Sequence, residues 1–187
     1  MNGKNRWTES TKKHVGKLQN LIEDLVVLTR LDEMQDVMME YTDVSVLVSE
    51  TVEPFREIVE NSGRGFEAHI EPDLTVKTEK RSFQQLVSIL MDNAAKYCDE
   101  GGNIFIDLYS GNRGKQVKLC IKNTYVSGKD LDFSFFFERF YRADASHKSE
   151  IPGFGIGLSM GREIAERMGG KLEAGYEGDT ISFTVIW

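Results

Sequence analysis

The sequence predicts an α+β protein in which a mixed, mainly antiparallel sheet carries helices on one face, preceded by an N-terminal amphipathic helix. Three observations favour this fold class. Apolar residues recur at three- and four-residue steps over residues 8–34, a spacing typical of a helix. Beyond residue 41, helical segments and strand hairpins intermix without the regular alternation of a doubly wound fold. The 187 residues are enough for one domain of ordinary size with an appendage.

The first predicted helix has an apolar stripe that it cannot bury alone. The stripe comprises Val15, Leu18, Leu21, Ile22, Leu25, Leu28 and Leu31. It therefore needs a packing partner, which is either another copy of this helix or a helix that the chain does not contain. A terminal helix folded back onto the domain is the alternative. Because the pattern changes near residue 41, we divide the chain into segments 1–40 and 41–187.

The second segment alternates between helical and extended patterns. A helix is predicted over 43–61, and the glycines of Ser62-Gly-Arg-Gly65 end it because glycine accepts the left-handed conformation of a helix terminus. The other predicted elements are strands over 66–71 and 74–78, a helix over 79–97, strands over 103–109 and 116–121, an aromatic helix that includes 135–142, a glycine-led helix over 155–168, and strands over 171–176 and 180–186.

Composition narrows the classes of function and location. The formal net charge of −7 argues against a nucleic-acid-binding protein. Cys98 and Cys120 lack a CxxC spacing, so reduced core thiols are expected, with a structural or redox-active pair as the alternative. The longest apolar runs fall far short of the ~20 residues that span a bilayer, and the N-terminus has no signal-peptide pattern. A soluble, intracellular chain is the expectation.

The predicted helix over 79–97 contains the first chemical motif. Asn93 and Lys96 are three residues apart and project in the same direction. They lie on a side away from this helix's own apolar stripe, which comprises Phe83, Leu86, Val87, Leu90, Ala94 and Cys98. An amide oxygen can ligate magnesium, and a neighbouring ammonium can balance phosphate charge. An ordinary solvated helix face is the alternative interpretation of this motif.

A glycine series supplies the second motif. Gly153, Gly155 and Gly157 precede Leu158 and the apolar periodicity of a helix. Glycines at a helix start let backbone N–H groups approach an anion, which the helix dipole also favours. The series matches neither the Walker A loop nor the dinucleotide-binding fingerprint. A flexible hinge before a helix is the alternative.

The aromatic segment between these motifs carries two arginines. If it is helical, Phe136 and Phe140 share one side that anchors it to the core, whereas Arg139 and Arg142 face away and can reach phosphate. The polar residues 143–152 that follow are expected to form a mobile lid. Surface arginines on an amphipathic helix are common, so this motif alone is weak.

In combination, the motifs resemble the ATP-binding catalytic domain of sensor histidine kinases, which has the Bergerat fold shared with type II topoisomerases and heat-shock chaperones. Gln85–Tyr97 resembles the family's N box, Phe137–Arg142 its F box and Gly153–Leu158 its G2 box. The resemblance implies a two-layer α/β sandwich over 41–187. Upstream, Lys17–Asp32 is similar to the second helix of the family's dimerisation and phosphoacceptor hairpin, so segment 1–40 would be part of that hairpin in a homodimer.

The resemblance implies a protein-histidine kinase that transfers the γ-phosphoryl group of ATP to a histidine. Gln85, Asn93 and Lys96 would be catalytic: Asn93 would ligate Mg²⁺ and Lys96 would contact phosphate. The further ATP-binding residues would be Tyr97, Asn123, Arg139, Arg142, Gly153, Gly155, Gly157 and Leu158. The implied partners are the protein's own phosphoacceptor hairpin, a response regulator and a second copy of the chain, with no nucleic acid. The implied location is the cytoplasmic part of a membrane-anchored sensor.

The sequence departs from this family in two respects. The Ser-His-Glu signature of the phosphoacceptor helix is absent, and the three histidines are poor substitutes: His14 has the wrong helix context, His69 lies in a predicted strand and His147 in the predicted lid. In the box that binds the base, Asn123 replaces an aspartate, while Tyr125 and Ser127 replace glycines; Ile89 replaces a second asparagine of the N box. Because an amide can also donate, we hypothesise weaker base selectivity than usual.

Two alternatives to a histidine kinase remain open at this point. One is a non-catalytic signalling module of the same fold, which either binds nucleotide or is degenerate and binds it poorly or not at all. The other is a different Bergerat ATPase, or a serine kinase that acts in an anti-sigma pathway. The N and F boxes, the glycine series and the hairpin-like first helix favour the histidine kinase over this second alternative, whereas an assay is needed to separate it from the first.

Overall fold

A computed structural model of the protein describes residues 11, 15, 38–142 and 154–187. The predicted lid over 143–152 lies outside the described residues, and so does the predicted N-terminal helix apart from Thr11 and Val15. Both therefore stay predictions, as does the division of the chain at residue 41.

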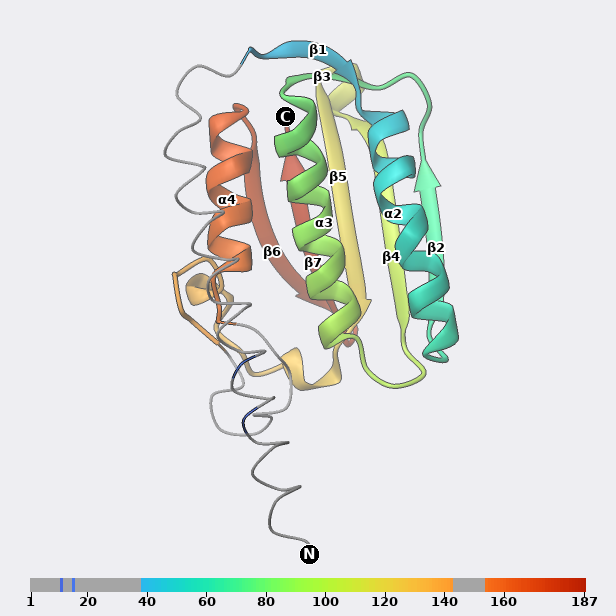
Figure 1. Ribbon diagram of the computed structural model, residues 1–187, viewed down its shortest axis with the longest axis vertical. Helices are drawn as coiled ribbons and strands as arrows, with labels where there is room; N and C mark the ends of the chain where they lie inside the picture. The colour runs from blue at the N-terminus through green and yellow to red at the C-terminus, as the bar shows by residue number, and fades with distance from the viewer. Residues whose placement is uncertain (1–10, 12–14, 16–37, 143–153) are drawn as a thin grey trace, which may run out of the picture.

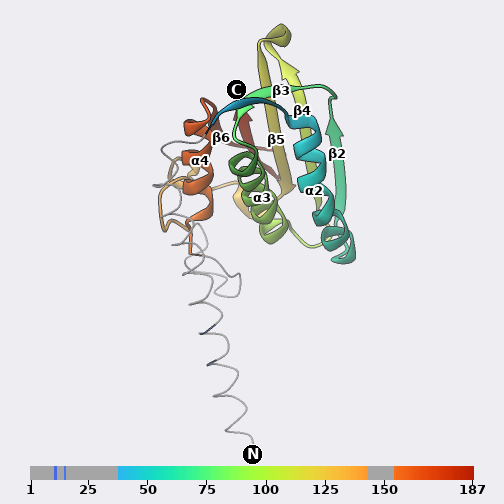
Figure 2. The same ribbon diagram turned by 45° about the horizontal axis from the view of Figure 1, so that its top comes forward.

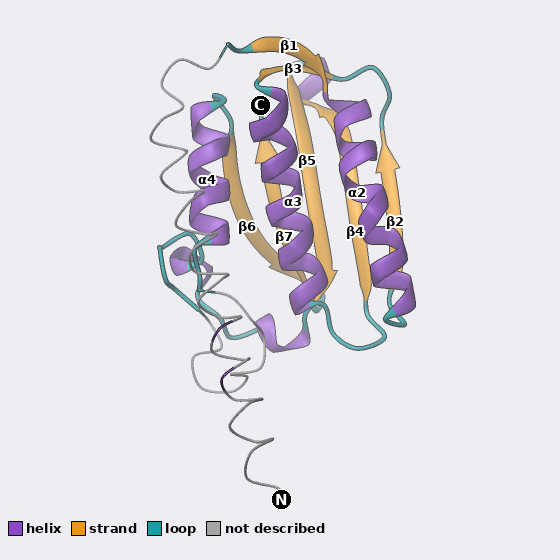
Figure 3. Cartoon of the chain, viewed as in Figure 1, coloured by secondary structure: helices purple, strands orange, loops and turns teal. Residues whose placement is uncertain are grey.

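The described part of the chain folds as two layers. The main-chain elements are β1 (Glu40–Asp43), α2 (Val44–Asn61), β2 (Gly65–Ile70), β3 (Thr75–Thr78), α3 (Lys80–Tyr97), β4 (Asn103–Gly111), β5 (Gln116–Thr124), α4 (Gly157–Arg167), β6 (Lys171–Glu177) and β7 (Thr180–Ile186). Short 3₁₀ turns lie at Asn112–Gly114 (η2), Val126–Gly128 (η3) and Phe133–Phe135 (η4). The helices α2, α3 and α4 all cover the same face of the sheet (Figures 1 and 3).

The main sheet has the strand order β2-β4-β5-β7-β6. Only β2 and β4 pair in parallel, and every other neighbouring pair is antiparallel. This confirms the predicted fold class. The β4–β5 hairpin extends beyond the neighbouring strands (Figure 2). The strands on either side of Pro72-Asp73 do not pair with each other, because β3 instead pairs with β1, a strand that the sequence did not predict.

The helix α3 lies at the centre of the helical layer and supplies much of the core. Its predicted apolar stripe is buried as expected, each side chain being at most 3% exposed: Phe83, Leu86, Val87, Leu90, Ala94 and Cys98. These side chains belong to the same core cluster as Ile104, Ile121 and Phe183 of the sheet. Burial of this stripe fixes the rotation of α3, and its other side faces the site described below.

The start of α3 is fixed by a side-chain cap. The Glu79 carboxylate accepts hydrogen bonds from the backbone N–H groups of Arg81, at 2.9 Å, and Ser82, at 2.6 Å. Burial alone would raise the pKa of Glu79, but these hydrogen bonds outweigh it and hold the pKa below its ordinary value. The carboxylate thus satisfies two N–H groups that the helix itself leaves without acceptors.

The prediction of an aromatic helix that includes residues 135–142 is wrong. The segment forms one 3₁₀ turn, η4, followed by irregular turns up to Arg142. Phe140 adopts φ +67°, a left-handed conformation that a right-handed helix cannot contain. Its N–H donates to the Gly155 carbonyl at 2.9 Å, and its ring is 64% exposed instead of sharing a core-facing side with Phe136.

Cys98 and Cys120 are free and buried, as expected of core thiols. Burial raises the pKa of both groups. Among the described residues, no helix combines the length and apolar character needed to cross a membrane.

Candidate functional site

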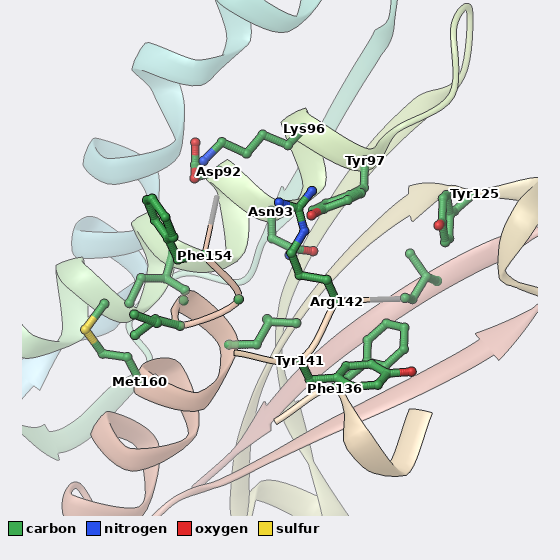
Figure 4. Close-up of a pocket in the computed structure, with 16 residues that line it drawn as sticks. Asp92, Asn93, Lys96, Tyr97, Tyr125, Phe136, Tyr141, Arg142, Phe154 and Met160 are labelled. Carbon is green, nitrogen blue, oxygen red and sulfur yellow. Dashed lines mark hydrogen bonds and ion pairs between the residues drawn. The ribbon is translucent and has the colours of Figure 1, made fainter. Parts of the chain in front are cut away.

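A pocket of about 200 Å³ opens between the C-terminal half of α3, the start of α4 and the chain around Phe136–Arg142. Figure 4 shows that its two ends differ in chemistry. Asp92, Asn93 and Lys96 form a charged and polar end, whereas Tyr97, Tyr125, Phe136 and Tyr141 form an aromatic end. A ligand with a charged group and a flat apolar group would match this polarity.

The polar end is built within one helix. Ile89, Asn93 and Lys96 recur at helical spacing, so the buried stripe on the opposite side of α3 directs them to the pocket. Lys96 forms an ion pair with Asp92 one turn earlier on α3. Ile89 makes the wall apolar at the position where the resemblance leads one to expect a second asparagine.

The start of α4 forms the opposite wall. Gly155, Gly157 and Leu158 line the pocket, as do Phe154 and Ile156. Gly155 adopts φ +74°, and a Cβ at this position would lie 2.5 Å from the Tyr141 carbonyl oxygen. The N-cap residue Ile156 provides no side-chain hydrogen bond to the first turn of α4, which leaves this helix start suited to an anion.

The two predicted phosphate-binding arginines have different surroundings. Arg142 lines the pocket, and in Figure 4 its side chain extends toward Asn93 and Tyr97. Arg139 is absent from the pocket lining; its guanidinium pairs with Glu163 of α4 at 3.3 Å. A direct contact between Arg139 and phosphate stays a prediction.

Two further predicted residues also lie outside the pocket lining, and one cannot be placed. The Gln85 amide contacts the Met160 sulfur at 3.9 Å, two helical turns from Asn93. Asn123 is fully buried: its Nδ2 donates to the Thr124 carbonyl at 3.2 Å, and its Oδ1 has no partner among the described residues. Gly153 lies outside the described residues.

The orientation of the Asn123 amide bears on base selectivity. The Thr124 carbonyl can only accept, so the side-chain NH₂ must face it, and the side-chain oxygen is the group left without a partner. One of the two N–H groups of the amide is therefore engaged by Thr124, and this orientation leaves the side-chain oxygen as an acceptor without a partner among the described residues.

Sequence reasoning missed part of the aromatic end. Tyr125 was noted only as a replacement for glycine, yet it lines the pocket, and its ring meets that of Tyr97 edge-on with the centroids 6.4 Å apart. Phe136 and Tyr141 were expected only to anchor their segment, but both line the pocket. No local sequence signal distinguishes an aromatic wall from an aromatic core residue.

Comparison with known proteins identifies the ATPase family. Residues 78–186 match the family described as "Histidine kinase-, DNA gyrase B-, and HSP90-like ATPase". The chain belongs to this family. The matched region runs from the last residue of β3 to the end of β7, so this ATPase domain includes every described element that lines the pocket.

Similar proteins within this ATPase family are sensor kinases. The chain is 29% identical over 182 residues to the sensor protein DltS of Streptococcus agalactiae serotype III (strain NEM316), covering 97% of this chain and 45% of DltS. The chain spans about half the length of the curated relatives it matches.

Solved structures show the same fold. The histidine kinase AdeS of Acinetobacter baumannii superimposes with a TM-score of 0.71 at 20% identity, covering 96% of this chain and 82% of that one. Full-length ShkA, solved in complex with AMPPNP, superimposes with a TM-score of 0.73 at 18% identity, covering 100% of this chain and 39% of that one.

Proposed function

We propose that this chain is the ATP-binding catalytic part of a two-component sensor histidine kinase, which transfers the γ-phosphoryl group of ATP to a histidine on a hairpin helix that the chain lacks. The observation that carries the proposal is one pocket that joins the N-box residues Asn93 and Lys96 to the glycines Gly155 and Gly157. Family membership and the sensor kinases among the relatives support it.

The polar end of the pocket fits a magnesium–phosphate group. Asn93 presents an amide and Asp92 a carboxylate, and oxygen ligands of these kinds are the ones that magnesium prefers. We assign Asn93 as a metal ligand. Mg²⁺, when bound, would neutralise part of the charge on the transferring phosphoryl group.

Charge neutralisation by Lys96 and Arg142 completes this end of the site. Lys96 is held by Asp92, so its ammonium is retained at the rim of the pocket where phosphate would lie. Arg142 approaches from the opposite side. Gly155 and Gly157 line the pocket at the start of α4, where the backbone N–H groups of the first turn would bind the phosphate chain. Together these residues would hold the phosphates in line with an incoming nucleophile.

The aromatic end fits a nucleobase. The rings of Tyr97 and Tyr125, with Ile181 beside them, provide flat apolar walls. Asn123 is the register partner of Ile181 on the neighbouring strand β7, and its side-chain oxygen has no hydrogen-bond partner among the described residues. We assign Asn123 Oδ1 as the acceptor for an exocyclic amino group, such as that of adenine.

The parent protein would supply the remaining parts. Segment 1–40 would be the second helix of a dimerisation hairpin, segment 41–187 the catalytic domain, and the missing first helix the phosphoacceptor. A response regulator would receive the phosphoryl group, and the active assembly would be a homodimer. A sensor of this type would be anchored to the membrane, with the kinase part in the cytoplasm.

Binding and phosphotransfer are tested separately. Calorimetric titration with an ATP analogue and Mg²⁺ is expected to show one site per chain, and Asn93→Ala should abolish the magnesium-dependent part of binding. Asn61→Ala, at the exposed end of α2 and absent from the pocket lining, is the matched control and should bind as the unaltered chain does.

Phosphotransfer is assayed with Mg-ATP and a separate phosphoacceptor hairpin from the parent protein. An acid-labile, base-stable label should appear on the hairpin and vanish with Asn93→Ala. The replacement of the base-box residues by Asn123 and Tyr125 favours one alternative, a nucleotide-binding or degenerate module of the same fold without catalysis. Absence of any label on the hairpin, with or without ATP binding, would replace our proposal with that alternative.

A further inference from the structure

We infer that Arg139 and Glu163 form a positioning pair that holds Arg142 in the pocket. This inference rests on the proposed function and adds to it a residue pair outside the pocket lining. Arg139 comes two residues before Tyr141 and three before Arg142, and Glu163 lies on α4, so their ion pair joins two walls of the pocket.

Together with two other contacts between described residues, the ion pair ties the segment Phe137–Arg142 to α4 and the residues just before it. The Arg162 guanidinium lies over the Phe137 ring, 5.7 Å from its centroid. Arg139 pairs with Glu163 at 3.3 Å. The Phe140 N–H donates to the Gly155 carbonyl at 2.9 Å.

Phe140 explains why such ties are needed. Its left-handed backbone, at φ +67°, is unfavourable for a residue with a Cβ, and its ring is 64% exposed, so little burial offsets the cost. The conformation persists only where surrounding contacts hold it. The Arg139 ion pair, one residue earlier, and the hydrogen bond from the Phe140 N–H to Gly155 hold the chain as it enters this residue, and the chain then reaches the pocket as Tyr141 and Arg142.

Glu163 is suited to hold this segment because its carboxylate is itself held. Its Oε1 accepts from Arg167 at 2.8 Å, one turn along α4, while Oε2 accepts from Arg139. The intrahelical bond orients the carboxylate, so less side-chain freedom is lost when Arg139 binds. In this arrangement Arg139 acts through Glu163 on the position of Arg142, in place of the direct phosphate contact that the family resemblance implies for it.

The test uses a double-mutant cycle on the whole chain. Because Arg139 and Glu163 are partly exposed, we expect Arg139→Gln and Glu163→Gln each to raise the Kd for an ATP analogue with Mg²⁺ roughly two- to fivefold. Label transfer at saturating ATP should fall less than the affinity does, since the pair acts on the position of Arg142 and its loss removes no phosphate-binding group from the pocket. The double variant should bind no more weakly than either single variant, and Arg139→Lys should restore most of the affinity.

Two controls make the result specific. Arg167→Gln removes the intrahelical ion pair of Glu163 but leaves the contact with Arg139, so it should change the Kd less than Glu163→Gln does. Hydrogen exchange of the Phe140 amide in the absence of nucleotide should accelerate more in Arg139→Gln and Glu163→Gln than in Arg167→Gln.

The outcomes separate this inference from the proposed function. Additive losses in the double variant, unchanged Kd values in both single variants, or unchanged Phe140 exchange would each overturn the positioning role. An unaltered chain that binds no ATP would refute the proposed function, whatever the exchange of Phe140 shows, and would overturn the inference with it.

Discussion

Gly155→Ala is predicted to be more damaging than its small size suggests, because it places a Cβ against backbone rather than against a side chain. The new atom would lie 2.5 Å from the Tyr141 carbonyl oxygen and 2.9 Å from the Phe140 carbonyl carbon. Neither neighbour can rotate away. The variant must therefore either distort the start of α4 or separate it from the segment that carries Arg142.

The expected magnitude has two parts. A left-handed conformation costs an L-residue about 1–2 kcal/mol, and Gly155 has φ +74°. Overpacking against a fixed neighbour typically adds about 1–3 kcal/mol. We therefore expect the free energy of unfolding to fall by about 2–5 kcal/mol, or, if the junction opens locally, a smaller fall accompanied by weaker nucleotide binding.

Gly169→Ala provides the matched control. Gly169 has nearly the same backbone angle, φ +72°, but a Cβ there meets nothing within 4 Å. The free energy of unfolding of Gly169→Ala should therefore fall only by the conformational cost of about 1–2 kcal/mol, and the nucleotide affinity should not change. Urea unfolding and titration with an ATP analogue measure both quantities. Equal losses of stability and equal affinities in the two variants would refute the argument that close approach at Gly155 builds the pocket.

Three further predictions concern single groups. Glu79→Gln should lower the free energy of unfolding by about 1 kcal/mol near pH 7. Since the folded-state pKa of Glu79 is lowered, the difference between the two proteins should shrink as the pH falls through the range where glutamate titrates, and a pH-independent difference would show that the ionised carboxylate is not what caps α3. ATP should bind more tightly than GTP, because the unpartnered Asn123 Oδ1 can accept from the adenine amino group, whereas Thr124 already engages one of the two N–H groups of the Asn123 amide; equal affinities in a competition titration would support our hypothesis of relaxed base selectivity. Cys98 and Cys120, whose pKa values burial raises, should react with a thiol reagent at neutral pH only after unfolding, and fast native-state reaction would contradict their burial.

Much of the fold could be predicted because the residues that specify each helix or strand lie close together in the sequence. The helix α3 has a stripe with a helical period and a polar second side, so both its burial and the exposure of Asn93 to the pocket follow from periodicity. The antiparallel strands β4 and β5 alternate clearly and are joined by a short glycine-containing turn. In these cases the residues that decide the structure are close in sequence.

The errors arise where distant contacts decide the structure. The aromatic segment has helical spacing, but the Phe140 N–H donates to the carbonyl of Gly155, fifteen residues later, instead of to a helical acceptor. Arg139 and Glu163 are 24 residues apart, and no pattern in the sequence between them indicates that they pair. β1 was missed because four mixed residues become a strand only when β3 lies beside them.

This contrast predicts two kinds of functional defect in the pocket. Asn93 and Lys96 are placed by a helix whose opposite side is fully buried, so substituting them should remove a contact while the wall stays in place. Arg142 is placed by a segment without regular structure, so its position depends on ties made elsewhere, at Gly155 and Glu163. Substitutions on α3 should therefore act on metal and phosphate directly, whereas substitutions at the ties should weaken binding without touching the ligand. Sequence motifs located Asn93, Lys96, Gly155 and Arg142, but not the pairing of Arg139 with Glu163, because that pairing joins residues far apart in the sequence.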